Sequence, residues 1–407
     1  MAKIIQKVAV IGGGTMGSGI AQKIAQSGID VVVKEVDEMR AVACRDKLHG
    51  QWDKVAGLGK LSSTELQSAK SHFSVTSSYD DIRDADIVIE AVFENMKAKK
   101  EVYEELNPLF PDDVIFTTNS SSLSIDEMAS VTNRPDRFMG THFFNPPVKA
   151  LLVELIRGQA TSDETYNSIK RFVETNLGNA SILVKGCPGY LVNRLLLPYL
   201  NEAARLLVET RLTFQEIDVY AKKFGWPMGP FELLDFVGLD IASSVAKILH
   251  DGYGERATPT SLMYRLVELG RIGDKVGVGF YNKKKVTDFE DIQVVIDREY
   301  PNRRELGAEE GFKRMMTGLC NESLMCLEEE IAPKDVIEEG ATKGIFFPMA
   351  LEGPLHYAQE KYGFANLLAD LNRFEREYGM RFKPAILLEQ LVSQNKKIFD
   401  KTEEEEW

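Results

Sequence analysis

Apolar and polar positions follow a regular order in the N-terminal stretch KVAVIGGGTMGSGIAQKIAQSGIDVVVKEVD. Residues 8–11 form an apolar run of strand length, and apolar side chains such as Ile20 and Ile24 then recur at helical spacing. Gly28 ends this helix, and residues 31–33 begin a second apolar run. The pattern predicts a strand, a tight glycine turn, a helix and a second strand.

The alternation of strands and helices continues along the first part of the chain. Residues 84–95 contain an apolar strand that ends in acidic side chains, and three lysines lie in the first turn of the helix that follows. Residues 114–116 form the next apolar strand, before a serine-rich turn and a helix that Ser124 caps. A further strand ends at His142. Strands that alternate with helices predict an α/β fold with a doubly wound parallel sheet, whose ligands bind at the carboxyl ends of the strands.

The pattern becomes helical after about residue 190, with the amphipathic segments LLLPYLNEAARLLVE, TFQEIDVYAKKF and PFELLDFVGLDIASSVAKIL. It then repeats, because Asn201 and Glu202 correspond to Asn321 and Glu322, and EIDVYAKKFGWPMGP corresponds to VIEEGATKGIFFPMALEGP. A duplicated helical domain is the simplest account of this similarity. His356, in the second copy, has no matching carboxylate in the sequence and is interpreted as structural.

These patterns divide the chain into four parts. We predict an α/β domain, a helical domain, a linker and a second, degenerate copy of the helical domain, at residues 1–185, 186–283, 284–306 and 307–400. The two glycines of residues 186–189 mark a hinge between the first two domains.

Composition narrows the classes of function. The 407 residues are 44% hydrophobic and 27% charged, which is typical of a soluble globular protein of two or three domains. The formal net charge of -13 argues against a general nucleic-acid binder, but a small ligand with phosphates needs only a local site. No signal peptide or long apolar stretch is present, so we expect a cytoplasmic protein that does not bind membranes. The four cysteines show no metal-ligand spacing and predict reduced thiols and no metal site.

The glycine turn carries the first chemical prediction. Gly12, Gly14 and Gly17 form G-x-G-x-x-G between a strand and a helix, and Glu35 follows at the end of the second strand. The glycines allow the turn, a close approach of the backbone to a diphosphate and close packing of the helix on the sheet. A Rossmann-type domain with NAD is therefore favoured, since Glu35 would accept hydrogen bonds from the ribose hydroxyls and repel the extra phosphate of NADP. FAD, S-adenosylmethionine or a turn without a ligand stay open as alternatives.

A histidine and a glutamate suggest proton transfer. His142 ends a strand at the predicted ligand-binding edge, and Glu154 lies in the apolar run LLVELI, where a carboxylate is unfavourable unless it is paired. A histidine whose second nitrogen binds a carboxylate has a fixed tautomer and is a better base. We therefore expect these two side chains to form a pair.

Five segments of the chain resemble the L-3-hydroxyacyl-CoA dehydrogenases of fatty-acid β-oxidation. They are, in order, GGGTMGSGIA, TNSSSLSI, GTHFFNPPVKALLVE, CPGYLVNRLLLPYLNEA and GWPMGPFELLDFVGLD, and the resemblance runs from about residue 5 to residue 282. It implies that His142 is the catalytic base, that Glu154 is its partner, and that Ser121 and Asn193 orient the substrate. Four further residues match positions that contact the nicotinamide half of the cofactor: Glu94, Lys99, Asn145 and Lys275.

The chain also departs from the family. Some members carry a cationic residue just before LVE, where this chain has Leu151, with Lys149 nearby. The residues that bind the nucleotide of coenzyme A do not follow from the spacing, and Lys54 and Lys60 are the candidates for that contact.

The resemblance implies an NAD-dependent oxidoreductase that acts on an acyl-CoA substrate. One alternative is the same scaffold acting on a free hydroxy acid or sugar acid, and a remoter one is a non-catalytic NAD-binding sensor. Single-copy relatives pair their helical domains between subunits, and multifunctional relatives carry two copies in one chain. We therefore predict that the two copies pack together as an internal pseudo-dimer, so that a monomer is favoured over an obligate homodimer.

Overall fold

The computed structural model describes residues 3–285 and 290–399. The chain forms two compact units, residues 1–187 and 188–407, whose boundary falls within the predicted hinge. Residues 286–289 of the predicted linker and residue 400 of the predicted second copy lie outside the described residues. The finer division into four parts stays a prediction.

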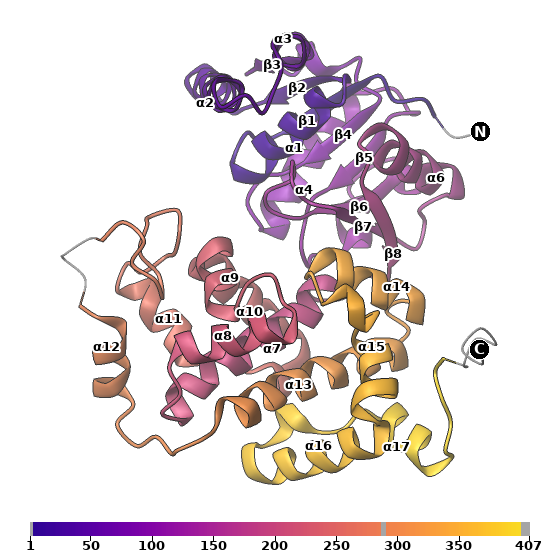
Figure 1. The fold of residues 1–407 in the computed structure, drawn as a ribbon. Helices are drawn as coiled ribbons and strands as arrows, with labels where there is room; N and C mark the ends of the chain where they lie inside the picture. The colour runs from indigo at the N-terminus through magenta and orange to yellow at the C-terminus, as the bar shows by residue number, and fades with distance from the viewer. Residues whose placement is uncertain (1–2, 286–289, 400–407) are drawn as a thin grey trace. The chain divides into compact units, whose positions relative to one another are not determined.

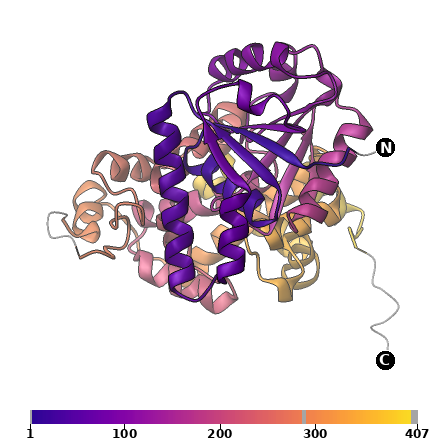
Figure 2. The same ribbon diagram turned by 90° about the horizontal axis from the view of Figure 1, so that it is seen from above.

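The first unit is built on an eight-stranded sheet with the order β3-β2-β1-β4-β5-β6-β7-β8 (Figures 1 and 2). Its strands are β1 (Lys7–Ile11), β2 (Asp30–Lys34), β3 (Phe73–Thr76), β4 (Ile87–Glu90), β5 (Ile115–Thr118), β6 (Phe138–Phe143), β7 (Leu152–Arg157) and β8 (Ala180–Val184). Its helices are α1 (Thr15–Gln26), α2 (Glu38–Gly57), α3 (Ser63–Ser71), α4 (Met96–Leu106), α5 (Ile125–Ala129) and α6 (Asp163–Arg171). The predicted α/β fold of the Rossmann type is confirmed.

The sequence predicts a parallel sheet, but in the structure one pair of neighbouring strands is antiparallel. Strands β1 to β6 are parallel to one another, but β7 runs antiparallel to β6, and β8 is parallel to β7. The physical reason is the short connection at residues 144–151, because a crossover between parallel strands needs a dozen or more residues. The antiparallel pairing places His142 directly opposite Glu154.

The second unit consists of helices. They are α7 (Val192–Glu209), α8 (Phe214–Phe224), α9 (Pro230–Val237), α10 (Leu239–Tyr253), α11 (Ser261–Glu268), α12 (Ile292–Glu299), α13 (Ala308–Glu328), α14 (Lys334–Glu339), α15 (Pro354–His356), α16 (Phe364–Tyr378) and α17 (Ile386–Ser393). The long helices α7 and α13 pack against each other (Figure 1). Helix α12 lies in the predicted linker.

Equivalent contacts occur in the two helical copies. The Asn201 amide donates to the carbonyl of Thr258 at 2.9 Å and accepts from the amide of Thr260 at 2.8 Å. In the same way the Asn321 amide donates to the carbonyl of Lys383 at 2.8 Å and accepts from the amide of Ala385 at 2.9 Å. The asparagines that matched in the sequence thus anchor equivalent segments.

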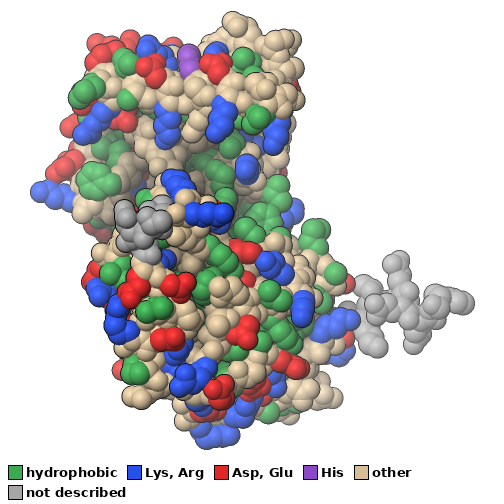
Figure 3. Space-filling view, turned by 60° about the vertical axis from the view of Figure 1, so that its left-hand side comes forward, with side chains coloured by type: hydrophobic (Ala, Val, Ile, Leu, Met, Phe, Trp, Pro, Cys, Tyr) green, Lys and Arg blue, Asp and Glu red, His purple; other side chains and the backbone are tan. Residues whose placement is uncertain are grey.

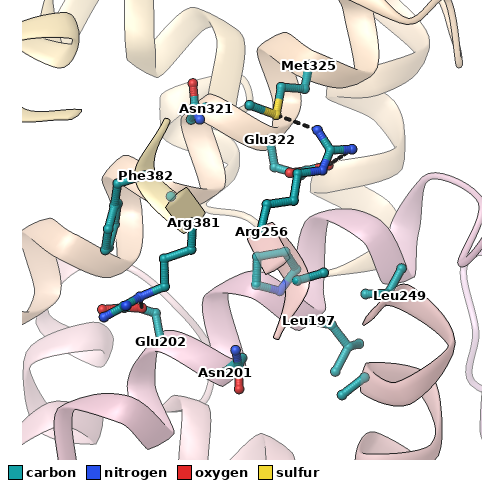
Figure 4. Close-up of a pocket in the computed structure, with 14 residues that line it drawn as sticks. Leu197, Asn201, Glu202, Leu249, Arg256, Asn321, Glu322, Met325, Arg381 and Phe382 are labelled. Atoms are coloured by element: carbon teal, nitrogen blue, oxygen red, sulfur yellow. Dashed lines mark hydrogen bonds and ion pairs between the residues drawn. The ribbon is translucent and has the colours of Figure 1, made fainter. Parts of the chain in front are cut away.

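A twofold network of ion pairs joins the copies. Arg194 of α7 binds Glu322 of α13 at 2.5 Å and Glu329, which directly follows α13, at 2.7 Å. The equivalent Arg314 of α13 binds Glu202 and Glu209 on α7. Each group has a second arginine. Arg256 approaches Glu322 and Glu329, and Arg381 approaches Glu202 and Glu209. Figure 4 shows Arg256 beside Glu322 and Arg381 beside Glu202. Burial opposes the charge on Glu202, but Arg314 and Arg381 outweigh it and hold the pKa of this carboxyl below its usual value.

The sequence interpretation of His356 was wrong about its neighbours. Its ring lies 3.2 Å from Glu338 through Nδ1 and 3.5 Å from Glu352 through Nε2. Glu338 also accepts hydrogen bonds from the amides of Leu355 and His356, and burial raises its pKa to about 8. Asp218 accepts from the first two amides of the equivalent helix in the first copy, at Phe231 and Glu232. Glu338 therefore caps a short helix, and this role is structural.

On the face shown in Figure 3, acidic and basic side chains are interspersed. In the part of the chain that the structure describes, no helix has both the length and the apolar character needed to cross a membrane. Among the same residues, no group of three or more His, Cys, Asp or Glu side chains is arranged to hold a metal ion.

Candidate active site

The glycine turn forms an anion-binding surface at the start of α1. Gly14 caps this helix without a side-chain hydrogen bond, and the first turn carries no acidic residue. A Cβ at Gly14 would meet no atom within 4 Å, so the backbone is open to a ligand there. The exposed N–H groups and the positive end of the helix dipole favour a diphosphate at this place. These features fit the NAD that the sequence predicts.

Gly17 is required by a close approach, and we expect Gly17→Ala to weaken NADH binding at least tenfold, roughly the effect of 1.4 kcal/mol. A Cβ at this position would lie 1.8 Å from the carbonyl oxygen of Gly12, so the turn must shift. Titration of NADH fluorescence measures the effect. Gly50→Ala is the matched control, since Gly50 lies in α2 with no atom within 4 Å of its Cβ position. Equal affinity of the Gly17 variant and the wild type would contradict the assigned geometry.

Glu35 lies just after β2, beside the glycine turn. Its carboxylate accepts hydrogen bonds from the amides of Gly13 at 2.7 Å and Val36 at 3.2 Å. A Cβ at Gly13 would meet the Glu35 carboxylate at 2.9 Å and the sulfur of Cys44 at 2.8 Å. Burial raises the pKa of the Cys44 thiol to about 11, which keeps it protonated. The turn therefore positions Glu35 where the ribose of an adenosine ligand is expected.

A buried ion pair lies at the carboxyl end of β4. Lys99 is 1% exposed, and its amine binds both carboxylate oxygens of Glu90, at 2.7 and 2.9 Å. Glu90 also accepts from the Thr118 hydroxyl at 2.6 Å. The Lys99 amine lies 3.4 Å from Glu94, whose side chain is 32% exposed. The Lys99 amine thus lies between the carboxylates of Glu90 and Glu94, and the cofactor contact that the resemblance implies stays a prediction.

Glu94 in turn holds the serine-rich turn after β5. Its Oε1 accepts from the Ser120 hydroxyl at 2.5 Å and from the Ser121 amide at 2.9 Å. The Ser122 hydroxyl donates to the same oxygen at 3.3 Å. Glu94 binds the backbone amide of Ser121 and not its side chain. Among the described residues, the Ser121 hydroxyl makes no hydrogen bond. Ser121 and Glu94 are thus brought together at one edge of the sheet.

His142 and Glu154 form the predicted pair. The His142 ring lies 2.7 Å from Glu154 through Nδ1, and the two side chains are 6% and 0% exposed. The Phe144 ring contacts the imidazole edge to face, with 4.8 Å between the ring centres. A carboxylate on Nδ1 favours the tautomer with the proton on Nδ1, so that Nε2 carries the lone pair of the neutral ring. This arrangement can accept and return a proton at Nε2.

The other predicted residues lie at separate places. Asn145 is exposed directly after β6, at the same edge as His142, whereas Lys54 and Lys60 are exposed at the end of α2 and in the following loop. Asn193 and Lys275 belong to the second unit. Lys275 binds Asp240 at 2.6 Å there, and Asn193 lies in the first turn of α7.

Three residues of the site escaped the sequence analysis. Gly13 donates to Glu35, Glu90 holds Lys99, and the Asn119 side chain accepts from the amide of Phe143 at 2.9 Å, next to His142. The pairing of Glu90 could have been predicted from the sequence, because an acid at the end of the apolar run DIVIE needs a partner. The candidate partners of Glu90 were the lysines in the first turn of the helix that follows.

Comparisons with known proteins identify the family. Residues 7–187 match the family model "3-hydroxyacyl-CoA dehydrogenase, NAD binding domain", and residues 189–283 match "3-hydroxyacyl-CoA dehydrogenase, C-terminal domain". The predicted NAD-binding domain is thereby confirmed. The fatty acid oxidation complex subunit alpha of Acinetobacter baylyi is 34% identical over 97% of this chain and 56% of the relative. The chain thus spans little more than half the length of that relative.

Two solved structures are similar as well. The 3-hydroxybutyryl-CoA dehydrogenase of Escherichia coli K12 has a TM-score of 0.83 and 25% identity, and the match covers 96% of this chain and 99% of that one. The (S)-3-hydroxybutyryl-CoA dehydrogenase of Ralstonia eutropha has a TM-score of 0.63 and 38% identity, and the match covers 68% of this chain and 99% of that one. The fold, the glycine turn and these matches agree, and the chain belongs to the 3-hydroxyacyl-CoA dehydrogenase family.

Proposed function

We propose that the protein oxidises an L-3-hydroxyacyl-CoA to the 3-ketoacyl-CoA with NAD, and catalyses the reverse reduction. The observation that carries this proposal is the His142–Glu154 pair, which lies at the same edge of the sheet as the glycine turn and Glu35. A base at this edge is what removal of a hydroxyl proton requires. The family and the fold support the same reaction.

His142 takes the hydroxyl proton on Nε2 while Glu154 stabilises the imidazolium that forms. NAD held by the glycine turn and Glu35 would supply the acceptor for the hydride of the same carbon. In the reduction, protonated His142 donates its proton to the developing alkoxide. Ser121 and Asn193 hold the hydroxyl or the thioester carbonyl, which is a positioning effect.

We also propose roles for the remaining predicted residues. As the resemblance implies, we assign Glu94, Lys99, Asn145 and Lys275 to the nicotinamide half of the cofactor, and the Lys99 amine lies 3.4 Å from Glu94. Lys54 and Lys60 are exposed cations available to the phosphates of coenzyme A. The Acinetobacter baylyi relative is a subunit of a complex, whereas the ion pairs between the two helical copies favour a monomer here. The cytoplasmic location stays a prediction.

The test follows NADH absorbance with acetoacetyl-CoA. We expect rapid turnover with NADH and much slower turnover with NADPH, because Glu35 repels the additional phosphate. Free acetoacetate is the matched comparison substrate. Turnover of the free acid alone would favour a hydroxy-acid dehydrogenase, and NADH binding without any turnover would favour a sensor.

A further inference from the structure

Three charged side chains of alternating sign lie near the carboxyl end of β4: Glu90, Lys99 and Glu94. The Lys99 amine is 2.7 and 2.9 Å from the two carboxylate oxygens of Glu90, and 3.4 Å from Oε2 of Glu94. The side chains of Glu90 and Lys99 are buried, whereas that of Glu94 is 32% exposed. The group therefore has one more negative than positive charge, and its exposed member is a carboxylate.

Both oxygens of Glu90 have two donors each. Oε1 accepts from the Val92 amide at 2.7 Å and from Lys99, and Oε2 accepts from the Thr118 hydroxyl at 2.6 Å and from Lys99. Two donors on each oxygen fix the orientation of a buried carboxylate. Glu90 thus holds the Lys99 amine at one place, against its own carboxylate.

The two oxygens of Glu94 have different partners. Oε1 accepts from the Ser120 hydroxyl at 2.5 Å and from the Ser121 amide at 2.9 Å, and Oε2 is the oxygen that faces Lys99. The distance of 3.4 Å from Lys99 to Oε2 is longer than a close hydrogen bond between an ammonium and a carboxylate. Lys99 is therefore neutralised mainly by Glu90, and Glu94 keeps most of its negative charge.

We infer that Glu90 is a positioning residue that strengthens the binding of NAD⁺ relative to that of NADH. The inference rests on the proposed function, which assigns Glu94 to the nicotinamide half of the cofactor. The oxidised nicotinamide ring carries a positive charge and the reduced ring carries none, so a nearby carboxylate favours the oxidised form. Glu90 acts through Lys99, because it neutralises an amine that would otherwise cancel the charge of Glu94.

The first test removes the charge of Glu90 and keeps its shape. In Glu90→Gln the Lys99 amine has Glu94 as its remaining carboxylate partner, so the charge that faces the cofactor is cancelled. We expect the ratio of the dissociation constants, Kd for NAD⁺ divided by Kd for NADH, to rise roughly tenfold, the scale of one unit charge at the surface of a protein. Isothermal titration calorimetry measures both constants without a substrate, and hence independently of activity.

A double variant separates the effect of charge from an effect on the fold. Glu90→Gln, Lys99→Met removes both buried charges and leaves Glu94 as the charged member of the group. The ratio should return to within about threefold of the wild type, because a buried ion pair can be replaced as a whole at little cost. A purely structural role of Glu90 predicts that the double variant is no better than the single one. Glu101→Gln is the matched control, since Glu101 lies on α4 with a side chain 58% exposed, and it should change the ratio less than about twofold.

Glu94→Gln gives a second test that does not depend on the folding of Glu90→Gln. It removes the facing charge and leaves the pair of Glu90 and Lys99 intact, so the ratio should rise roughly tenfold as well. An unchanged ratio in either single variant, or a double variant that keeps the raised ratio, would overturn the inference. A wild type that binds neither form of the cofactor would overturn it too. If the variants follow the expected ratios but the wild type does not reduce acetoacetyl-CoA, the proposed substrate is wrong and the inference about Glu90 holds.

Discussion

His142→Gln lowers kcat for the reduction of acetoacetyl-CoA by roughly 100- to 10,000-fold, the usual contribution of a general acid or base. The amide keeps a hydrogen-bonding group opposite Glu154 but cannot carry a proton to the substrate oxygen. NADH binding should be unchanged, because the glycine turn and Glu35 lie on other strands. Stopped-flow absorbance and NADH fluorescence measure the two quantities separately.

The chain offers a matched control for this variant. His72 lies 2.6 Å from Asp30 through Nδ1, so it is also a histidine paired with a carboxylate. This pair lies at the amino ends of β2 and β3, away from the carboxyl ends that bear His142. We expect His72→Gln to retain full kcat. A similar loss in both variants would assign the effect of His142 to general destabilisation.

Local patterns explain why much of the first unit could be predicted. The apolar runs coincide with β1, β2, β4 and β5 because strands buried on both faces of a parallel sheet read as continuous apolar segments. The G-x-G-x-x-G turn was recognised because its glycines are required by backbone geometry. His142 and Glu154 were recognisable because a carboxylate in an apolar run needs a partner, and here the partner is one strand away.

Contacts between distant residues set the limit of the prediction. The direction of β7 depends on the length of a connection whose ends could not be placed precisely from sequence. The burial of Lys99 depends on Glu90, and a first-turn lysine looks the same whether it faces solvent or a buried acid. His356 was interpreted as lacking a carboxylate because Glu338 lies in a different helix of the repeat.

The repeat shows the same limit on a larger scale. Matching pairs such as Asn201 and Asn321 predict a duplication, but they do not reveal which charges meet across the two predicted copies. Arg194 and Glu322 are far apart in sequence, and their pairing follows only from the packing of α7 on α13. This pairing makes the pseudo-dimer testable through stability.

Arg314→Met should reduce the free energy of unfolding by about 3–5 kcal/mol, the effect of removing one partner from a buried ion pair. The Arg314 side chain is 0% exposed and binds Glu202, which is 6% exposed, so methionine fills the space but leaves a buried carboxylate with one fewer cation. For a unit of this size the loss corresponds to a fall in Tm of roughly 10 °C.

The twofold arrangement makes this prediction specific. Arg194→Met should destabilise the full chain by a similar amount, because Arg194 has the equivalent partners Glu322 and Glu329. Arg211→Met removes an exposed ion pair with Glu305 and should change stability by less than about 0.5 kcal/mol. Thermal and urea denaturation compare the three variants. If the variants of Arg194 and Arg314 lower the free energy of unfolding no more than Arg211→Met does, the contact between the copies does not stabilise the second unit. If both variants lose stability and the wild type has the mass of a monomer, the two helical copies pair within one chain, as the sequence predicts.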